Sequence, residues 1–304
     1  MFIAGIDIGG TSIKAMIVDE KKNVHFSFVL PTAAQDGKNA ILKNLFLCIE
    51  TCSKEYAIQG IGIGTAGRVN VKTGEIVYAT DNLPGWEGTK LKELVESEFG
   101  LPAAIENDAN AALIGEMWTG AAQNYQDAVM LTLGTGVGGA QAIRGRVHHG
   151  SGWSGGEWGH SILYPGGKPC NCGLKGCIEQ YLSGRALLSR ANTESIVIFR
   201  NGSEVFEEFE KGNPDIIKVV EGYLDDLVTV LTTLRNGMDP EVILIGGGVI
   251  DSRRIWWPLL ESKLAALPFQ LYVRPAELGN NAGCVGAGKM MLDMLLEQSV
   301  NKVL

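Results

Sequence analysis

The sequence lacks the features that mark membrane, secreted and nucleic-acid-binding proteins. No stretch of about 18 consecutive apolar residues occurs, which excludes a transmembrane helix. A secretory signal peptide is also absent, so we expect a cytoplasmic protein whose cysteines stay reduced. Basic residues are few: 26 lysines and arginines stand against 34 acids, a net charge of 26 − 34 = −8. This deficit of positive charge argues against a nucleic-acid partner.

The chain is rich in glycine, with 40 among its 304 residues, and many of them fall in clusters. Clustered glycines indicate turns at which the backbone approaches another group closely. Hydrophobic residues make up 45% of the chain, which is enough for a sizeable core. The length favours two domains over one. No low-complexity tract or obvious linker marks a boundary, so the domains must be placed from motifs.

A metal site is predicted where one histidine and three cysteines fall within eighteen positions, joined by glycine and proline: His160, Cys170, Cys172 and Cys177. Disulfides, or free thiols beside an unrelated histidine, are the alternatives, and a reducing compartment disfavours disulfides. The set closes a tetrahedral Zn²⁺ site and leaves no position for an activated water, so we expect the zinc to be structural. The remaining cysteines lie in apolar segments and are expected in the core: Cys48, Cys52 and Cys284.

The hydrophobic pattern predicts an alternation of strands and helices. We expect strands at 2–8, 13–18, 24–30, 59–64, 103–106, 127–133, 137–143 and 241–245. We expect helices at 39–56, 90–99, 107–118, 183–191, 203–211, 214–236 and about 282–297.

Two glycine-rich turns each join a pair of these strands, Gly9-Gly10-Thr11 and Gly134-Thr135-Gly136. The units that hold them stand about 126 residues apart and predict two related halves. Amides in such turns point outward and bind anions. One turn alone is weak evidence for an anion site, because glycine is common in hairpins. A third run, Gly246-Gly247-Gly248, follows a late strand.

Two other kinds of nucleotide site are excluded at these turns. Neither turn is followed by Gly-Lys-Ser/Thr, and both lead into strands rather than helices, so a Walker loop and a dinucleotide fingerprint do not fit. A nucleotide held between two hairpins remains. Asp7 precedes the first turn and suits Mg²⁺ held through water. Lys14 either adds a charge near the phosphates or is a solvated strand lysine.

With these motifs the sequence resembles the ROK family of bacterial sugar kinases (repressors, open reading frames and kinases). The likeness covers nearly the whole chain, and its most specific block runs from Glu157 to Glu179. It implies the α/β, two-lobed actin-like ATPase or hexokinase (ribonuclease H-like) fold with an interlobe cleft. We expect lobes at 1–118 and 119–304, with the last helix packing back on the first lobe. The resemblance also implies ATP phosphates on both turns, adenosine beside Gly246–Gly248, and a homodimer.

Asp108 is the expected catalytic base. Glu106-Asn107-Asp108 ends a strand and opens a helix, where Asn and Asp are also favoured simply as caps. A kinase needs a carboxylate to take the proton of the attacking hydroxyl, and the matching Asp has this role in the family. A helix N-terminus helps to keep that carboxylate ionised. We also expect Asn107 to contact the sugar.

The residues that flank the zinc motif fit sugar recognition. Carboxylates accept the hydrogen bonds that sugar hydroxyls donate, so Glu157 and Glu179 are expected to bind the ring. Taken alone, Glu157 reads as a solvated loop acid and Glu179 as a helix-start acid. The family also has His160 face the sugar with the ring nitrogen that zinc does not use.

The identity of the sugar stays open. By resemblance, Asn82 in Asn82-Leu83-Pro84-Gly85-Trp86 contacts the sugar. The alternative is a loop that is simply anchored by a buried Trp86. Gly67 lies at a strand end, where α/β sites form. Many glucokinases of the family have proline where this chain has Ala66, and some N-acetylmannosamine kinases have a small residue there. We therefore expect an ATP-dependent hexose 6-kinase, with glucose favoured and N-acetylmannosamine or another N-acetylhexosamine as the alternative.

Two other classes of function are less well supported. A sugar-sensing repressor carries about 60 residues of DNA-binding domain before its sugar domain, and here Asp7 follows the first strand residues directly. A non-catalytic sugar-binding protein would not need complete phosphate turns together with Asp108. Of the remaining features, we expect Trp256-Trp257 in the core or at a subunit contact. We expect His148-His149 on the surface, or as an alternative ligand pair.

Overall fold

The computed structural model describes residues 1–301, which form two compact units. Unit 1 comprises Met1–Asn124, His149–Gly155 and the chain from Asn280 onward. Unit 2 comprises Tyr125–His148 and Gly156–Gly279. The short segment 149–155 therefore belongs to unit 1, although the chain on both sides of it belongs to unit 2. No helix within residues 1–301 has the length and apolarity needed to span a membrane.

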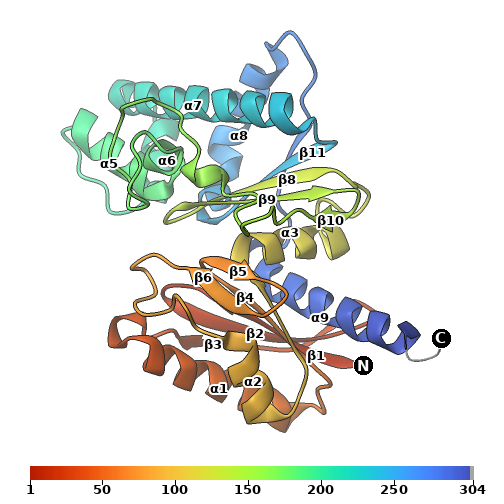
Figure 1. Ribbon diagram of the computed structural model, residues 1–304. Coiled ribbons are helices and arrows are strands. Elements are labelled where there is room, and N and C mark those ends of the chain that lie inside the picture. Colours follow the sequence, from red (N-terminus) through yellow and green to blue (C-terminus); the bar gives the residue numbers. More distant parts are fainter. Residues whose placement is uncertain (302–304) are drawn as a thin grey trace. The chain divides into compact units, whose positions relative to one another are not determined.

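The core of unit 1 is a five-stranded sheet in the order β3-β2-β1-β4-β7 (Figure 1). Strands β1 (Phe2–Ile8), β2 (Ser12–Asp19) and β3 (Val24–Pro31) form an antiparallel meander. Strands β4 (Ile61–Thr65) and β7 (Ala103–Asn107) continue the sheet parallel to β1. A small hairpin, β5 (Arg68–Asn70) and β6 (Glu75–Tyr78), follows β4. Parallel β1, β4 and β7 end at one edge, where α/β proteins place their sites.

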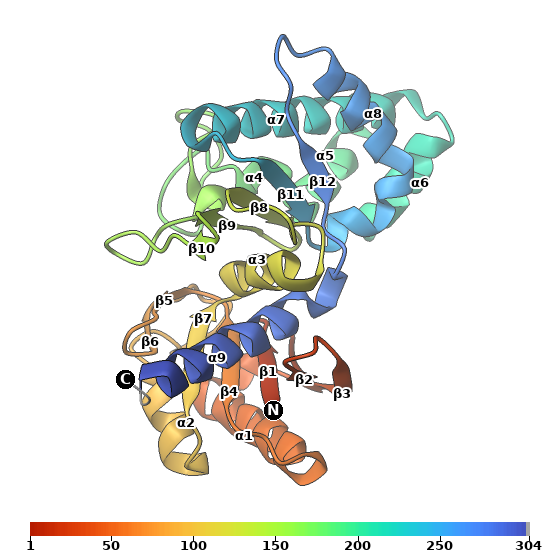
Figure 2. The ribbon, with the colours of Figure 1, turned by 90° about the vertical axis from the view of Figure 1, so that its right-hand side faces the viewer.

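Helices cover both faces of this sheet (Figures 1 and 2). Helices α1 (Lys38–Glu55) and α2 (Leu91–Phe99) bury their apolar sides against one face. Helices α3 (Asp108–Thr119) and α9 (Ala282–Asn301) pack together on the other. The approach is close because both layers carry glycine. A Cβ at Gly62 would lie 1.9 Å from the Ala287 carbonyl oxygen, and one at Gly286 would lie 1.7 Å from that of Ala111.

Unit 2 repeats the same strand plan in the order β10-β9-β8-β11-β12. Strands β8 (Ala128–Leu133), β9 (Val137–Ile143) and β10 (Arg146–Val147) are antiparallel neighbours. Strands β11 (Val242–Gly246) and β12 (Val273–Pro275) run parallel to β8. The first hairpin of each unit, β1–β2 and β8–β9, therefore occupies the same place in its sheet. The internal repeat predicted from the two glycine turns is therefore a repeat of strand order in the two sheets.

The core of unit 2 is built from its sheet and helices α4 (Glu179–Leu182), α5 (Gly184–Glu194), α6 (Gly202–Glu210), α7 (Pro214–Met238) and α8 (Arg253–Ala265). The long helix α7 starts cleanly because Asn213 caps it and Pro214 occupies its first position. Trp256 of α8 is fully buried and stacks with Phe206. The prediction of a core tryptophan is confirmed for Trp256, but its helix was missed because Pro258 lies within it.

Candidate active site

Several predicted site residues lie at the edge of the unit 1 sheet where its parallel strands end. Asp7 lies near the end of β1, Gly67 follows β4, and Asn107 and Asp108 join β7 to α3. Asn107 connects two of these segments, since its Nδ2 donates to the Gly67 carbonyl at 2.9 Å and to Asp108 Oδ1 at 3.0 Å. Gly67 has φ +103°, and a Cβ there would lie 2.5 Å from the Tyr78 carbonyl oxygen, so only glycine fits.

Asp108 opens helix α3 under a capped N-terminus. Asn107 is the N-cap, because its Oδ1 accepts the Asn110 amide at 3.0 Å. The Asp108 carboxylate accepts the Ala109 amide at 2.8 Å. Burial raises the pKa of Asp108, and the hydrogen bonds from Ala109 and Asn107 oppose that rise. The result is an acid with a fixed orientation and a greater affinity for a proton than a surface carboxylate.

Asp7 is a second perturbed acid in unit 1. Burial, followed by the charge of Asp108, raises the pKa of Asp7 to about 7, while Lys14 opposes the shift. Lys14 is the antiparallel partner of Asp7 across β1 and β2, and its Nζ donates to the Asn280 carbonyl at 3.3 Å. Gly283 in the first turn of α9 leaves room for the carboxylate, since a Cβ there would lie 2.8 Å from Asp7 Cγ.

The loop that holds Asn82 also belongs to unit 1. Trp86 is fully buried, and its Nε1 donates to Thr65 Oγ1 at 3.0 Å, which anchors the loop to the end of β4. Asn82 itself is exposed. A Cβ at Gly10 would lie 3.8 Å from the Asn82 carbonyl oxygen, so the loop adjoins the first glycine turn. The Gly9 amide donates to the Ser12 carbonyl at 3.0 Å and closes that turn, with Gly10 and Thr11 at its tip.

One contact in unit 1 contradicts the sequence prediction for His149. Expected on the surface or as a metal ligand, this residue instead pairs with Glu106, its Nε2 2.6 Å from Glu106 Oε2. The Glu106 side chain is only 3% exposed. His148 does lie exposed. The glycine-rich context suggested a surface loop, and nothing local in the sequence indicates a partner 43 positions away.

In unit 2 the second glycine turn lies beside the third glycine run. The Gly134 amide donates to the Gly136 carbonyl at 3.0 Å and closes the β8–β9 turn. Gly247 has φ +81°, and a Cβ there would lie 2.5 Å from the Leu133 carbonyl oxygen. Gly246 and Gly248 flank it at the end of β11. The two predicted nucleotide segments of this unit are therefore in contact at the carboxyl ends of β8 and β11.

Glu179 reaches the same turn. Its Oε2 accepts the Val137 amide at 3.1 Å, and a Cβ at Gly136 would lie 2.3 Å from that oxygen. Arg185, which the sequence reading did not single out, donates from Nε to the Thr135 carbonyl at 2.8 Å. A cavity of about 410 Å³ lies here, and its lining includes Thr135, Lys168, Glu179 and Arg185.

Glu157 is carried by a segment that packs tightly on β9. A Cβ at Gly159 would lie 1.9 Å from the Val137 carbonyl oxygen. Gly156 has φ +88° and lies against Ala140. The glycines before and after Glu157 are thus needed to bring this segment against the strand. Gly156 and Gly159, part of a glycine cluster in the sequence, therefore allow this segment to pack closely on β9.

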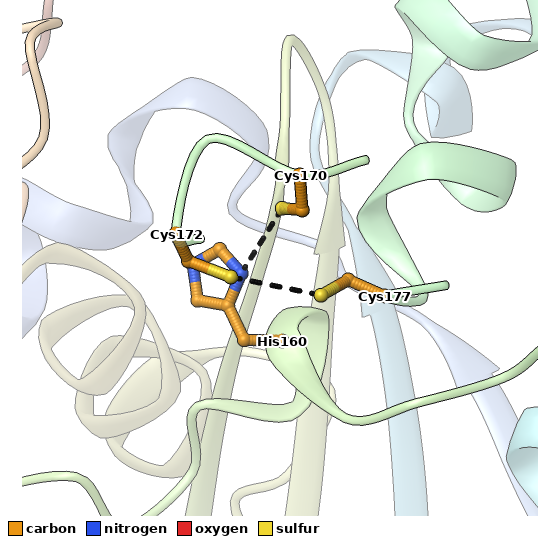
Figure 3. A group of neighbouring side chains, drawn as sticks. All are labelled: His160, Cys170, Cys172 and Cys177. Atoms are coloured by element: carbon orange, nitrogen blue, oxygen red, sulfur yellow. Dashed lines mark hydrogen bonds between the residues drawn. The ribbon is translucent and has the colours of Figure 1, made fainter. Parts of the chain in front are cut away.

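The predicted metal ligands converge (Figure 3). One donor atom from each of His160, Cys170, Cys172 and Cys177 lies within 4.8 Å of all the others. Cys170 Sγ is 3.7 Å from His160 Nδ1, and Cys172 Sγ is 3.6 Å from Cys177 Sγ. Ligands around a tetrahedral zinc stand about 3.5–3.8 Å apart, given the usual Zn–S and Zn–N lengths. The donor set and spacing therefore fit Zn²⁺.

Burial and the neighbouring Cys172 and Cys170 thiols raise the pKa of the Cys177 thiol, so without a metal this thiol stays protonated. The three cysteines expected in the core, Cys48, Cys52 and Cys284, are buried apart from it, as predicted.

Comparison with known proteins finds matches over nearly the whole chain, among them two curated kinases and a solved structure. A glucokinase from Halalkalibacterium halodurans is 32% identical over 310 residues, which cover 93% of each chain. An N-acetyl-D-glucosamine kinase from Aliivibrio salmonicida is 29% identical over 302 residues, or 93% of this chain and 97% of its own. The crystal structure of a ROK family glucokinase from Streptomyces griseus, in complex with glucose and AMPPNP, superposes with a TM-score of 0.84. That enzyme is 31% identical, and the match covers 96% of this chain and all of the other.

Two α/β sheets of the same topology, each with a glycine turn in its first hairpin, define the two-lobed actin-like ATPase or hexokinase fold. The sequence profile of the ROK family matches residues 3–294, and the chain belongs to that family. The predicted fold is confirmed, and so is the predicted activity class, an ATP-dependent hexose kinase.

Proposed function

We propose that this kinase transfers the γ-phosphoryl group of ATP to the 6-hydroxyl of glucose, with Asp108 as the general base. The observation that carries the proposal is the setting of Asp108 at a capped helix N-terminus, beside Asp7 and the Asn107–Gly67 hydrogen bond. A general base works best when its pKa approaches the working pH, and burial moves Asp108 in that direction. The hydrogen bonds from Asn107 and Ala109 fix the carboxylate for proton abstraction.

The glycine turns are proposed to bind the phosphates of ATP. Gly9 and Gly134 close their turns with their own amides, which leaves the tips, Gly10-Thr11 and Thr135-Gly136, to face a ligand. Mg²⁺ would neutralise developing charge on the transferred phosphoryl group. Asp7 would hold that ion through water, and Lys14 adds a positive charge on the same side of the sheet. Gly246–Gly248, in contact with the β8 end, are proposed to lie beside the adenosine.

The residues proposed to bind the sugar are Asn82, Gly67 and Asn107, together with Glu157, His160 and Glu179. His160 turns Nδ1 toward the cysteine cluster, which leaves Nε2 for a sugar hydroxyl. Glu179 Oε2 also accepts the Val137 amide, so one carboxylate would serve both the sugar and the phosphate turn.

Zinc is proposed as a structural clamp for this recognition segment. His160, Cys170, Cys172 and Cys177 would complete its coordination and so fix the two ends of the 160–177 loop. Sugar-binding Glu157 precedes that loop and Glu179 follows it, so the metal would hold both acids without touching them. The thiolate ligands require reduced cysteines, in agreement with the cytoplasmic location expected from the sequence. A homodimer remains the expected assembly.

An N-acetylhexosamine is the second candidate substrate, favoured by one local feature. The Ala66 amide donates to the Ile8 carbonyl at 3.3 Å, a bond that the proline of many family glucokinases has no N–H to make. This chain therefore makes a backbone hydrogen bond beside Gly67 that a proline at position 66 could not make. Comparing kcat/KM over a panel of hexoses and N-acetylhexosamines decides the matter. Glucose should exceed N-acetylmannosamine and N-acetylglucosamine by at least about tenfold, and the reverse order would replace glucose as the substrate.

A further inference from the structure

Residues 149–155 form a closed loop that is fastened to unit 1 by its own side chains. The Gly155 amide donates to the His149 carbonyl at 2.8 Å, so the two ends of the loop lie together. Ser154 Oγ accepts from Arg68 Nη1 at 2.8 Å, and Arg68 in turn lies over the Tyr78 ring. The Trp153 ring packs edge-on against the His149 imidazole. The loop is therefore held at its beginning and near its end.

The stronger anchor is the pair of His149 with Glu106. Burial alone would lower the pKa of His149, but the hydrogen bond and charge of Glu106 raise it overall. Both oxygens of the Glu106 carboxylate are hydrogen-bonded within unit 1. Its Oε2 meets His149, while Oε1 accepts the Asn107 amide at 2.8 Å and Asn110 Nδ2 at 3.0 Å. A carboxylate buried this deeply is costly unless it is fully paired.

Glu106 thereby supports the residues proposed for catalysis. The Asn107 amide that it binds belongs to the N-cap of α3, and the Asn107 side chain holds Asp108 Oδ1. On the other side, the 149–155 loop continues directly into Gly156 and the proposed sugar ligand Glu157. His149 thus begins the loop that leads to one proposed substrate-binding segment, and it hydrogen-bonds to the residue that supports Asp108.

We propose that His149 is a positioning residue for phosphoryl transfer, which acts through Glu106 and Asn107 to hold Asp108. This inference rests on the proposed function, in which Asp108 is the base. Without the imidazole, Glu106 has an unpaired buried charge and turns toward other donors, which displaces the Asn107 amide. A base displaced by about 1 Å loses up to about 100-fold in rate.

Steady-state kinetics with glucose and ATP test the proposal on four variants. His149→Ala should lower kcat by about 10- to 100-fold while the glucose dissociation constant, from calorimetry, changes less than about threefold. His149→Gln retains a donor and should recover most of kcat. Glu106→Gln/His149→Ala carries no unpaired charge and should be no slower than His149→Ala alone. The exposed neighbour in His148→Ala is the matched control and should behave as wild type.

Three outcomes would overturn the inference. One is a kcat for His149→Ala within about twofold of wild type, and another is a double variant that is slower than His149→Ala alone. The third is a loss confined to glucose binding, which would make His149 a structural support of the sugar site. If His149→Ala does not fold, the same comparison of kcat with the glucose dissociation constant is made on His149→Gln and Glu106→Gln. A wild-type protein without sugar-dependent ADP release would instead reject the proposed function itself.

Discussion

Asp7 and Asp108, at the ends of two strands of one sheet, are electrostatically coupled: the charge of Asp108 helps to raise the pKa of Asp7. Like charges held together in the free protein store repulsion that a bound cation relieves. Replacing either acid by its isosteric amide removes the charge while keeping the shape of the side chain. The effect of the charge on stability can therefore be measured separately from its effect on catalysis.

Asp7→Asn should stabilise the metal-free protein above pH 7. The pKa of Asp7 is raised from 3.8 to about 7, so the folded state binds the extra proton between these values and stability falls as pH rises through them. The variant escapes that loss. Its free energy of unfolding at pH 8 should exceed that of wild type by about 1–4 kcal/mol, with the difference vanishing near pH 4. Urea denaturation in EDTA measures it, and equal stability at pH 8 would contradict the shift.

The same variant should lose its catalytic use of Mg²⁺. We expect a fall in kcat/KM for MgATP of about 100-fold, with glucose affinity unchanged, since Asp7 is proposed to act only on the ion. Weaker glucose binding with normal turnover would place Asp7 in the sugar site instead.

Gly136→Ala should weaken ATP binding more than Gly134→Ala. The new methyl group at residue 136 would lie 2.3 Å from Glu179 Oε2, while nothing lies within 4 Å of a Cβ at residue 134. Pushing Glu179 away also breaks its bond to the Val137 amide. We expect KM for ATP to rise about tenfold or more in the first variant and several times less in the second. Equal effects would show that Glu179 does not support the turn.

Removing zinc should lower the melting temperature and the sugar affinity together. Structural zinc contributes folding free energy, and here it would hold the loop between Glu157 and Glu179. After treatment with a strong chelator we expect glucose to bind about tenfold more weakly, with recovery on adding zinc. Cys172→Ser should lack bound metal in elemental analysis, whereas Cys52→Ala, outside the cluster, should retain it. Full glucose affinity in zinc-free protein would reject the clamp.

The ion pair of His149 with Glu106 should make stability depend on pH. The folded pKa of His149 lies above 6.5, so its contribution is complete below pH 6.5 and is lost as pH rises through the raised value. Wild type should therefore melt above His149→Gln by about 2 °C or more at pH 6, and the gap should narrow at higher pH. A gap that widens with pH would mean that the neutral imidazole is the stabilising form.

Local patterns carried most of the fold. Alternating strands, the cap at Asn107 and the repeated glycine turns depend on residues close in sequence, and these elements were predicted within a few residues. Helix α8 was missed because Pro258 interrupts its pattern. The β5–β6 hairpin was missed because strands of three and four residues show too little alternation.

The candidate site was predicted less evenly. The metal cluster was readable because its ligands are few, chemically distinctive and nearly adjacent in sequence. His149 and Arg185 were not, since the partners Glu106 and Thr135 lie 43 and 50 positions away. A histidine in a glycine-rich loop and an arginine on a helix resemble surface residues until the fold places a buried carboxylate or a turn carbonyl beside them.

The central claim, that Asp108 takes the proton of a sugar hydroxyl, is tested most directly by comparing wild type with Asp108→Asn. One assay follows glucose-dependent ADP release, and calorimetry follows binding of glucose and of a non-hydrolysable ATP analogue. We predict turnover by wild type and a loss of at least about 10²–10⁴-fold in the variant, with both ligands still bound. Near-normal turnover by Asp108→Asn would contradict that role, and no nucleotide consumption by wild type with any monosaccharide would contradict the whole account.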